Sequence, residues 1–181
     1  MPRSDVGYEQ ARGAAVGPLL AVLADPARAA EYPNVRAALG RLGADAIRPL
    51  VGVLETGSPK LKIEALAALG QLEAKGSVAF LLAPYASPQS PAEVQAAAAA
   101  VLKQLFGLTP ARDEAARLVA EQARQFFDSR RLAREDLPGQ VEVWTWDEPS
   151  RQFVVKAYSV EDAGRILAAR LAREAFSIAP Q

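Results

Sequence analysis

The chain has 181 residues, half of them hydrophobic, and its 21 basic and 21 acidic side chains cancel to a net charge of zero. That length and apolar share suffice for one packed domain or a short repeat array. The balanced charge lacks the basic excess typical of proteins that bind nucleic acid or anionic membranes. With no cysteine and no histidine, disulfides, thiolate nucleophiles, cysteine-bound zinc and histidine general bases are excluded.

No segment of the sequence has the pattern of a membrane span or a leader. The longest apolar run, at 96–102, is far shorter than the roughly 20 residues that a spanning helix needs. The opening "MPRSDVGYEQ" lacks the apolar core of a signal peptide. We therefore expect a soluble protein without a membrane partner. The cytoplasm is favoured, while the compartment, the oligomeric state and the completeness of the chain stay open.

A helical repeat occupies most of the first 106 residues. The segments "VGPLLAVL" (16–23), "IRPLVGVL" (47–54) and "VAFLLAPY" (78–85) follow one another at intervals of 31 residues. Each has apolar residues spaced as on the buried face of a helix. Between them, "ALGRL" (38–42) recurs as "ALGQL" (68–72). The predicted unit is therefore helix, turn, helix, repeated three times.

Prolines mark the second helix of each unit. Pro33, Pro59 and Pro91 each lie near a predicted helix start, where the missing N–H costs little. One helical pair cannot bury its own apolar stripe, whereas stacked neighbours can, so the pattern predicts a short solenoid. The alternative is an irregular bundle whose internal similarity is accidental.

The second helices resemble a known family. "LKIEALAALGQLE" (61–73) is similar to the second helix of a short HEAT-like repeat of the PBS-lyase type, which reads V-R-x-x-A-A-x-A-L-G-x-L-G. Segments 32–51 and 94–106 keep parts of that pattern, so the resemblance covers about residues 14–106. It implies an α-α superhelix of a kind that serves mostly as a protein-binding scaffold. HEAT-like hydroxylases rely on histidines that this chain lacks, and the second helices hold too few cations for a HEAT-like DNA glycosylase.

The sequence after residue 106 changes character. Residues 111–135 read as one long amphipathic helix, with Thr109 as its expected N-cap. Its end is rich in arginine. These side chains either suit the negative end of the helix dipole or form a patch that binds phosphate or an acidic partner. The arginines are Arg130, Arg131 and Arg134.

The stretch "VEVWTWDEPSRQFVV" (141–155) predicts a two-stranded antiparallel ribbon, because valine, tryptophan and threonine favour strands. Taking "DEPS" as the turn pairs Trp146 with Arg151 and makes both faces apolar. Such a ribbon is unstable alone, so we expect the long helix and the last helix to cover it. The tryptophans either pack the ribbon as a cap on the solenoid or form an aromatic platform for a partner. Trp146, nearer the turn than Trp144, is the one expected to be exposed.

A last helix follows the ribbon directly. In "SVED" (159–162), Ser159 is the expected N-cap and Asp162 its capping-box partner. Residues 168–180, "AARLAREAFSIAP", show a weak similarity to the second helix of a tetratricopeptide-type pair. That similarity leaves open that a longer protein continues into another repeat array.

Together these elements predict a mainly α fold: a HEAT-like array of about three helical hairpins over 14–106, then a C-terminal cap over 107–181 of helix, β-hairpin and helix, packed on the array. No nucleotide-binding or nucleophile-elbow motif occurs. We expect no catalysis, cofactor, metal or nucleic acid, and a protein or peptide as partner. The alternatives are the N-terminal segment of a larger scaffold, or a small-ligand protein similar to HEAT-like bilin lyases, with its site between solenoid and hairpin. The candidate partner-binding residues are Arg36, Arg41, Lys62, Glu64, Gln71, Gln95, Lys103, Trp146 and Arg151.

Overall fold

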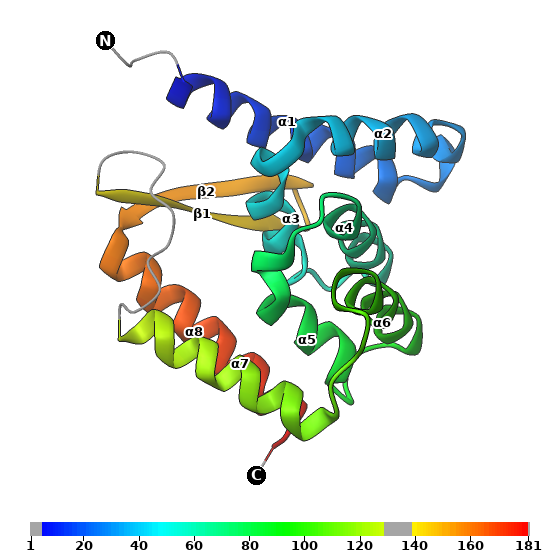
Figure 1. Ribbon diagram of the computed structural model, residues 1–181. Helices are drawn as coiled ribbons and strands as arrows, with labels where there is room; N and C mark the ends of the chain where they lie inside the picture. Colours follow the sequence, from blue (N-terminus) through cyan, green and yellow to red (C-terminus); the bar gives the residue numbers. More distant parts are fainter. Residues whose placement is uncertain (1–4, 129–138, 181) are drawn as a thin grey trace. The chain divides into compact units, whose positions relative to one another are not determined.

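The computed structural model describes residues 5–128 and 139–180. Most of these residues are helical, and a two-stranded antiparallel sheet precedes the C-terminal helix (Figure 1). The predicted mainly α fold with a β-hairpin is thereby confirmed. None of the helices described is both long and apolar enough to cross a membrane. The elements are α1 (Asp5–Ala24), η1 (Pro26–Glu31), α2 (Tyr32–Leu42), η2 (Gly43–Ala46), α3 (Ile47–Val53), α4 (Pro59–Gln71), η3 (Lys75–Ser77), α5 (Val78–Ala86), α6 (Ala92–Phe106), α7 (Arg112–Phe127), β1 (Gln140–Asp147), β2 (Gln152–Ser159) and α8 (Val160–Ile178).

The chain forms two compact units. Unit 1 comprises residues 1–74 and 144–155, and unit 2 comprises residues 75–143 and 156–181. The tip of the hairpin thus belongs with the N-terminal helices, while the outer ends of both strands belong with unit 2. The predicted division of the chain after residue 106 stays a prediction, because compactness does not test where a repeat begins or ends.

Unit 1 contains two of the predicted helical pairs. α1 contacts α2, and α3 contacts α4. The first helices of the two pairs contact each other, α1 with α3, and so do the second helices, α2 with α4. Leucines fill the space between them, as the apolar spacing in the sequence predicts. The fully buried leucines of this core are Leu20, Leu23, Leu39, Leu50, Leu66 and Leu69.

Proline positions in the second helices agree with the prediction. Pro33 lies in the first turn of α2, Pro59 begins α4 behind the N-cap Ser58, and Pro91 is itself the N-cap of α6. At these places a helix has no intrahelical use for the missing N–H. The prolines therefore start the second helices without weakening them.

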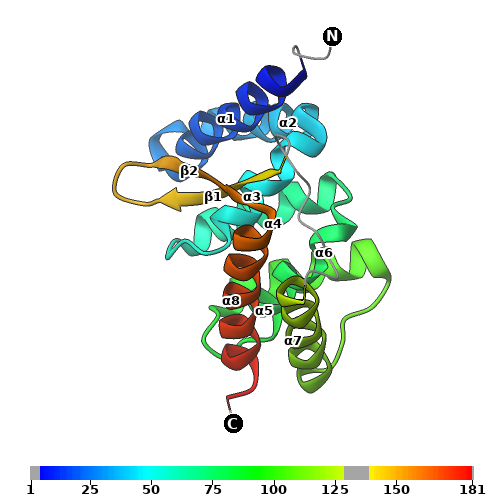
Figure 2. The ribbon, with the colours of Figure 1, turned by 90° about the vertical axis from the view of Figure 1, so that its left-hand side faces the viewer.

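Unit 2 is organised around α5, which contacts α6, α7 and α8. The most extensive contact is between α7 and α8, which lie side by side (Figures 1 and 2). Gly164 of α8 allows this close approach, since a Cβ there would lie 3.1 Å from the carbonyl oxygen of Phe126. At the other end of α8, the Ser87 hydroxyl donates to the carbonyl of Ser177 over 3.2 Å.

The ends of α7 and α8 test three sequence predictions. The N-cap of α8 is confirmed, because the Ser159 hydroxyl accepts from the Asp162 N–H at 3.1 Å. The prediction of Thr109 as N-cap of the long helix is wrong, since α7 follows Ala111 without a side-chain cap. α7 ends at Phe127 with Asp128 as its C-cap, and residues 129–135 of the predicted helix, which include its three arginines, lie outside the described residues.

The hairpin differs from its prediction in two respects. Its turn occupies 148–151, so Arg151 lies in the turn and does not pair with Trp146 in the ladder. Residues 144–155, moreover, pack with α1 and α3, whereas the long helix and the last helix belong to unit 2. For residues 144–155 the cover therefore differs from the predicted one. Glycines on α1 and α3 decide it, because they let these helices approach the strands closely.

Candidate functional site

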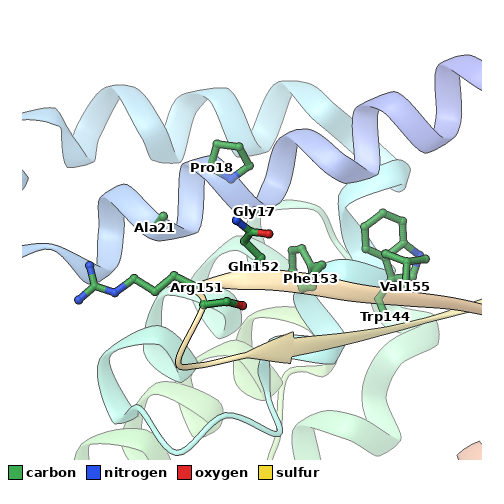
Figure 3. Close-up of a pocket in the computed structure, with 9 residues that line it drawn as sticks. Gly17, Pro18, Ala21, Trp144, Arg151, Gln152, Phe153 and Val155 are labelled. Atoms are coloured by element: carbon green, nitrogen blue, oxygen red, sulfur yellow. The ribbon is translucent and has the colours of Figure 1, made fainter.

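A pocket of about 520 Å³ lies in unit 1 between α1 and the tip of the hairpin. Figure 3 shows α1 passing over β2, with Arg151 at one end of the pocket and Trp144 and Val155 at the other. We call this the α1–hairpin groove. Its lining residues are Gly17, Pro18 and Ala21 of α1, Trp144 of β1, and Ser150, Arg151, Gln152, Phe153 and Val155 of the turn and β2.

The α1 wall of the groove is made of small or rigid residues. A Cβ on Gly17 would lie 3.4 Å from Cδ2 of Phe153, so the helix backbone is in contact with that ring. Pro18 follows within the same helix, and proline has no N–H to donate to the preceding turn. The wall therefore presents backbone and ring atoms rather than long side chains, which leaves the groove unfilled.

The floor of the groove is aromatic. The Phe153 ring packs edge-on against both indoles, at centroid distances of 5.5 Å from Trp144 and 5.2 Å from Trp146. These are favourable geometries for aromatic pairs. Phe153 itself is half-buried. The predicted shared face of Trp144, Trp146, Phe153 and Val155 is consistent with these contacts and with the lining of the groove.

Both tryptophans are buried. Trp144 is 9% exposed and Trp146 only 6% exposed, so the prediction that Trp146 is an exposed aromatic is wrong. The indole N–H of Trp146 is also buried without a hydrogen-bond partner among the described residues. Trp144 lines the groove and Trp146 does not. Both tryptophans therefore pack within the protein, as the sequence allowed. Of the two, only Trp144 lines the groove, where it can contact a ligand.

Hydrogen bonds of the turn fix the Arg151 end of the groove. The Asp147 carboxylate accepts from the Ser150 N–H at 3.1 Å and from its hydroxyl at 2.5 Å. The bond from the Ser150 hydroxyl, followed by that from its N–H, lowers the pKa of Asp147 below its ordinary value. The Glu148 carboxylate accepts from the Thr56 hydroxyl and, at 3.1 Å, from the Gly57 N–H. Neither acid lines the groove.

The backbone of Arg151 adopts an uncommon conformation. Its φ is 52°, in the left-handed region that few non-glycine residues adopt. Its N–H donates to the Glu148 carbonyl at 3.3 Å, which closes the turn. Its exposed side chain makes no hydrogen bond or ion pair with the part of the chain that is described. Arg151 is therefore a cation available at the rim of an apolar groove.

The predicted surface of second helices is only partly assembled. Arg36 of α2 and Glu64 of α4 form a two-pronged ion pair, with N–O distances of 2.8 and 2.6 Å. The hydrogen bond to Glu64 raises the pKa of Arg36. Glu64 is buried, so this pair joins two helices, while Arg36 itself stays exposed. Gln95 is similarly occupied, since its amide donates to the carbonyls of Ser87 and Ser90 at 2.9 and 3.0 Å.

The remaining candidates lie on different helix faces. Residues of an α-helix are about 100° apart, so Lys62 points about 200° away from Glu64, and Gln71 lies on nearly the same side as Glu64. Arg41, Gln71 and Lys103 are exposed, and Lys62 is half-buried. The structure brings Arg36 and Glu64 together and places Arg151 on the groove. It gives no single surface on which the predicted residues of unit 1 converge.

The sequence did not indicate the α1 side of the groove. Gly17, Pro18 and Ala21 carry no chemistry of their own, and their role depends on a strand more than 120 residues later in the chain. The only available signal was the Gly17–Pro18 pair inside a helical pattern, since both residues weaken a helix interior. Within the described residues, no group of acidic side chains is arranged to hold a metal ion.

No known protein family, curated protein or solved structure matches this chain.

Proposed function

We propose that the chain is a non-catalytic protein-interaction module that binds a peptide in the α1–hairpin groove. The observation that carries this proposal is an apolar groove with aromatic residues on its floor and an available cation at its rim. Binding sites are typically concave, mainly apolar and supplied with a few placed polar groups. Arg and Trp are also the residues that most often anchor protein interfaces. The proposal retains Arg151 from the candidate residues and replaces Trp146 with Trp144.

The pairing of helices in unit 1 supports a HEAT-like scaffold for this module. In such arrays the first helices of adjacent repeats pack together, and so do the second helices. α1 with α3 and α2 with α4 follow that rule. In this proposal the hairpin tip lies where a further repeat would otherwise cover α1 and α3, and it supplies one wall of the binding groove.

Two adjacent valines of β2 allow a matched test. Val155 lines the groove and is 40% exposed, whereas Val154 does not line it and is 45% exposed. Peptides would be selected from a random display library on the wild-type chain and remeasured on Val155→Arg and Val154→Arg. We expect Val155→Arg to lower affinity at least tenfold and Val154→Arg to leave it within about twofold. Thermal unfolding of both variants checks that each is folded.

Two results would redirect or end the proposal. Equal affinities for the two arginine variants would place binding elsewhere. If Arg41→Ala or Lys62→Ala then lowered affinity, the surface of second helices would be the site. Failure to select any peptide that depends on Val155 would remove the peptide-binding function altogether.

A small-ligand carrier is the second candidate, because a volume of about 520 Å³ lined by Trp144 and Phe153 lies within the range of small-molecule pockets. Against it, Arg151 is the one charged residue among those lining the groove, so charges do not converge there. A fluorescence screen of small apolar acids and amines, read in a Trp146→Phe variant that keeps Trp144, separates the two candidates. Saturable quenching reversed by Val155→Arg would favour the carrier.

A further inference from the structure

The groove is electrically asymmetric along its length. Arg151 lies at the turn end, and the opposite end is formed by Trp144 and Val155 (Figure 3). Asp147 and Glu148 of the hairpin do not line the groove, and they accept hydrogen bonds from Ser150 and from Thr56 and Gly57 respectively. An occupant therefore meets an available positive charge at one end and an apolar surface at the other. The complementary ligand has a negative group at one end and an apolar group at the other.

The distance between the two ends sets the spacing of these groups. Arg151 is the last residue of the turn, and from Gln152 to Val155 of β2 the chain advances three residues, which is about 10 Å at the roughly 3.3 Å rise of a strand. An extended peptide of about five residues spans this strand part together with Arg151 at its end. Between the ends, the Phe153 ring lies against Gly17, so the middle of the groove accepts only a small side chain.

The strand side of the groove favours an extended occupant. Phe153 and Val155 of β2 line it, and Val154 between them does not. A short extended segment likewise exposes its side chains alternately, so its alternate residues can face these two side chains.

We propose that the α1–hairpin groove recognises an extended peptide segment of about five residues, in which an acidic side chain pairs with Arg151, a small residue passes Phe153, and a large apolar side chain packs on Trp144 and Val155. This inference rests on the proposed peptide-binding function and adds the chemistry and the polarity of the ligand. Pairing at an exposed rim contributes modestly, and its main effect is to orient the segment in the groove.

Short synthetic peptides test the inference. The probes are N-acetylated, C-amidated pentapeptides with glutamate and leucine at the two ends, alanine in the middle and threonine between, made in both orders. Blocking both termini leaves the glutamate side chain as the one negative charge. Binding is followed through Trp144 fluorescence in full-length Trp146→Phe protein. We expect one order to bind better, and replacement of its glutamate by glutamine to weaken binding about two- to fivefold.

Substitution of Arg151 identifies the partner of the acidic group. Arg151→Gln is expected to weaken the glutamate peptide by the same factor, and to leave the glutamine peptide unchanged, because both changes remove one interaction. Arg151→Glu is expected to favour a lysine peptide over the glutamate peptide. Arg41→Gln removes the same charge from an exposed position away from the groove, and it serves as the control for net charge.

The outcomes separate this inference from the function on which it rests. If Val155→Arg abolishes peptide binding while Arg151→Gln changes nothing, the groove binds peptides and the acidic polarity is wrong. If no pentapeptide binds and the display selection yields no Val155-dependent peptide, both proposals are overturned. If octanoate binds with the Arg151 and Val155 dependence described and the peptides do not, the ligand is a small apolar carboxylate and the peptide assignment fails.

Discussion

Gly52 of α3 lies directly against the backbone carbonyl of Trp144 in β1. A Cβ placed on Gly52 would come within 2.3 Å of that oxygen and 3.0 Å of the carbonyl carbon. Both contacts are with main-chain atoms, which cannot rotate away as the end of a side chain can. The position of the hairpin tip on α3 therefore depends on the absence of a side chain at this one residue.

Gly52→Ala is expected to destabilise unit 1. Alanine is the better helix former by about 1 kcal/mol, but the new methyl group must displace the β1 backbone. Overpacking of this kind typically costs about 1–3 kcal/mol. The cost at Gly52 should lie toward the upper end of that range, because the new methyl group meets main-chain atoms. We expect the free energy of unfolding to fall by about 2 kcal/mol, measured by urea denaturation with far-ultraviolet circular dichroism.

Gly17→Ala is the matched control for that substitution. A Cβ on Gly17 meets only the side chain of Phe153, at 3.4 Å, which is ordinary contact with a ring that can shift slightly. The helix preference of alanine is offset in part by its Cβ beside the ring of Pro18, so stability should change by less than about 1 kcal/mol. Equal destabilisation by the two substitutions would contradict the close approach of α3 to β1.

Both tryptophans should be shielded from solvent. With exposures of 9% and 6%, Trp144 and Trp146 are expected to resist quenching by acrylamide. Single-tryptophan variants, Trp144→Phe and Trp146→Phe, assign the signal to each residue. A bound ligand should alter the emission of Trp144, which lines the groove, more than that of Trp146, which does not. If acrylamide quenched Trp146 freely, Trp146 would be exposed, and the interpretation of this residue as an aromatic platform for a partner would be correct.

Ser150→Ala should raise the pKa of Asp147. The hydroxyl of Ser150 contributes most to lowering that pKa below the ordinary value of 3.8, and its N–H contributes next. Because the alanine variant keeps the N–H, the pKa should return only part of the way. A carbon-13 NMR titration of the Asp147 carboxyl measures the change.

The same shift predicts how acid affects the turn. A carboxyl whose folded pKa is lowered contributes stability above its unfolded pKa and loses it as the pH falls through the folded value. The turn should therefore keep this contribution at neutral pH and lose it as the pH falls from the ordinary value of 3.8 toward the lowered folded pKa. Asp147→Asn should remove that part of the pH dependence. An unchanged dependence in this variant would show that the Ser150 bonds do not form in solution.

Glu64→Gln should weaken the contact between α2 and α4. The Glu64 side chain is 9% exposed and accepts two bonds from Arg36, which is 45% exposed. Charge-assisted paired bonds are strong, but solvent at Arg36 reduces their contribution, so we expect a loss of about 1 kcal/mol in urea denaturation. Glu31→Gln breaks an exposed pair with Arg28 and should change stability little. A larger loss for Glu31→Gln would reverse this ranking.

The sequence alone determined the helical pairs, the hairpin and the cap of α8. Each of these follows from local chemistry. Apolar residues at helical spacing mark a buried face, proline suits the first turn of a helix, and the Ser159 hydroxyl satisfies the N–H of Asp162. The absence of histidine and cysteine likewise excludes whole classes of site on composition alone.

Only the tertiary structure decided which surface the hairpin covers and where the groove lies. The groove joins Gly17 to Phe153 and depends on Gly52 beside Trp144, and such contacts leave no periodic trace in a sequence. Local patterns report which face of a segment is apolar, but they do not report which distant segment will bury it. That choice depends on the shapes of the packed surfaces, and here two glycines supply the space.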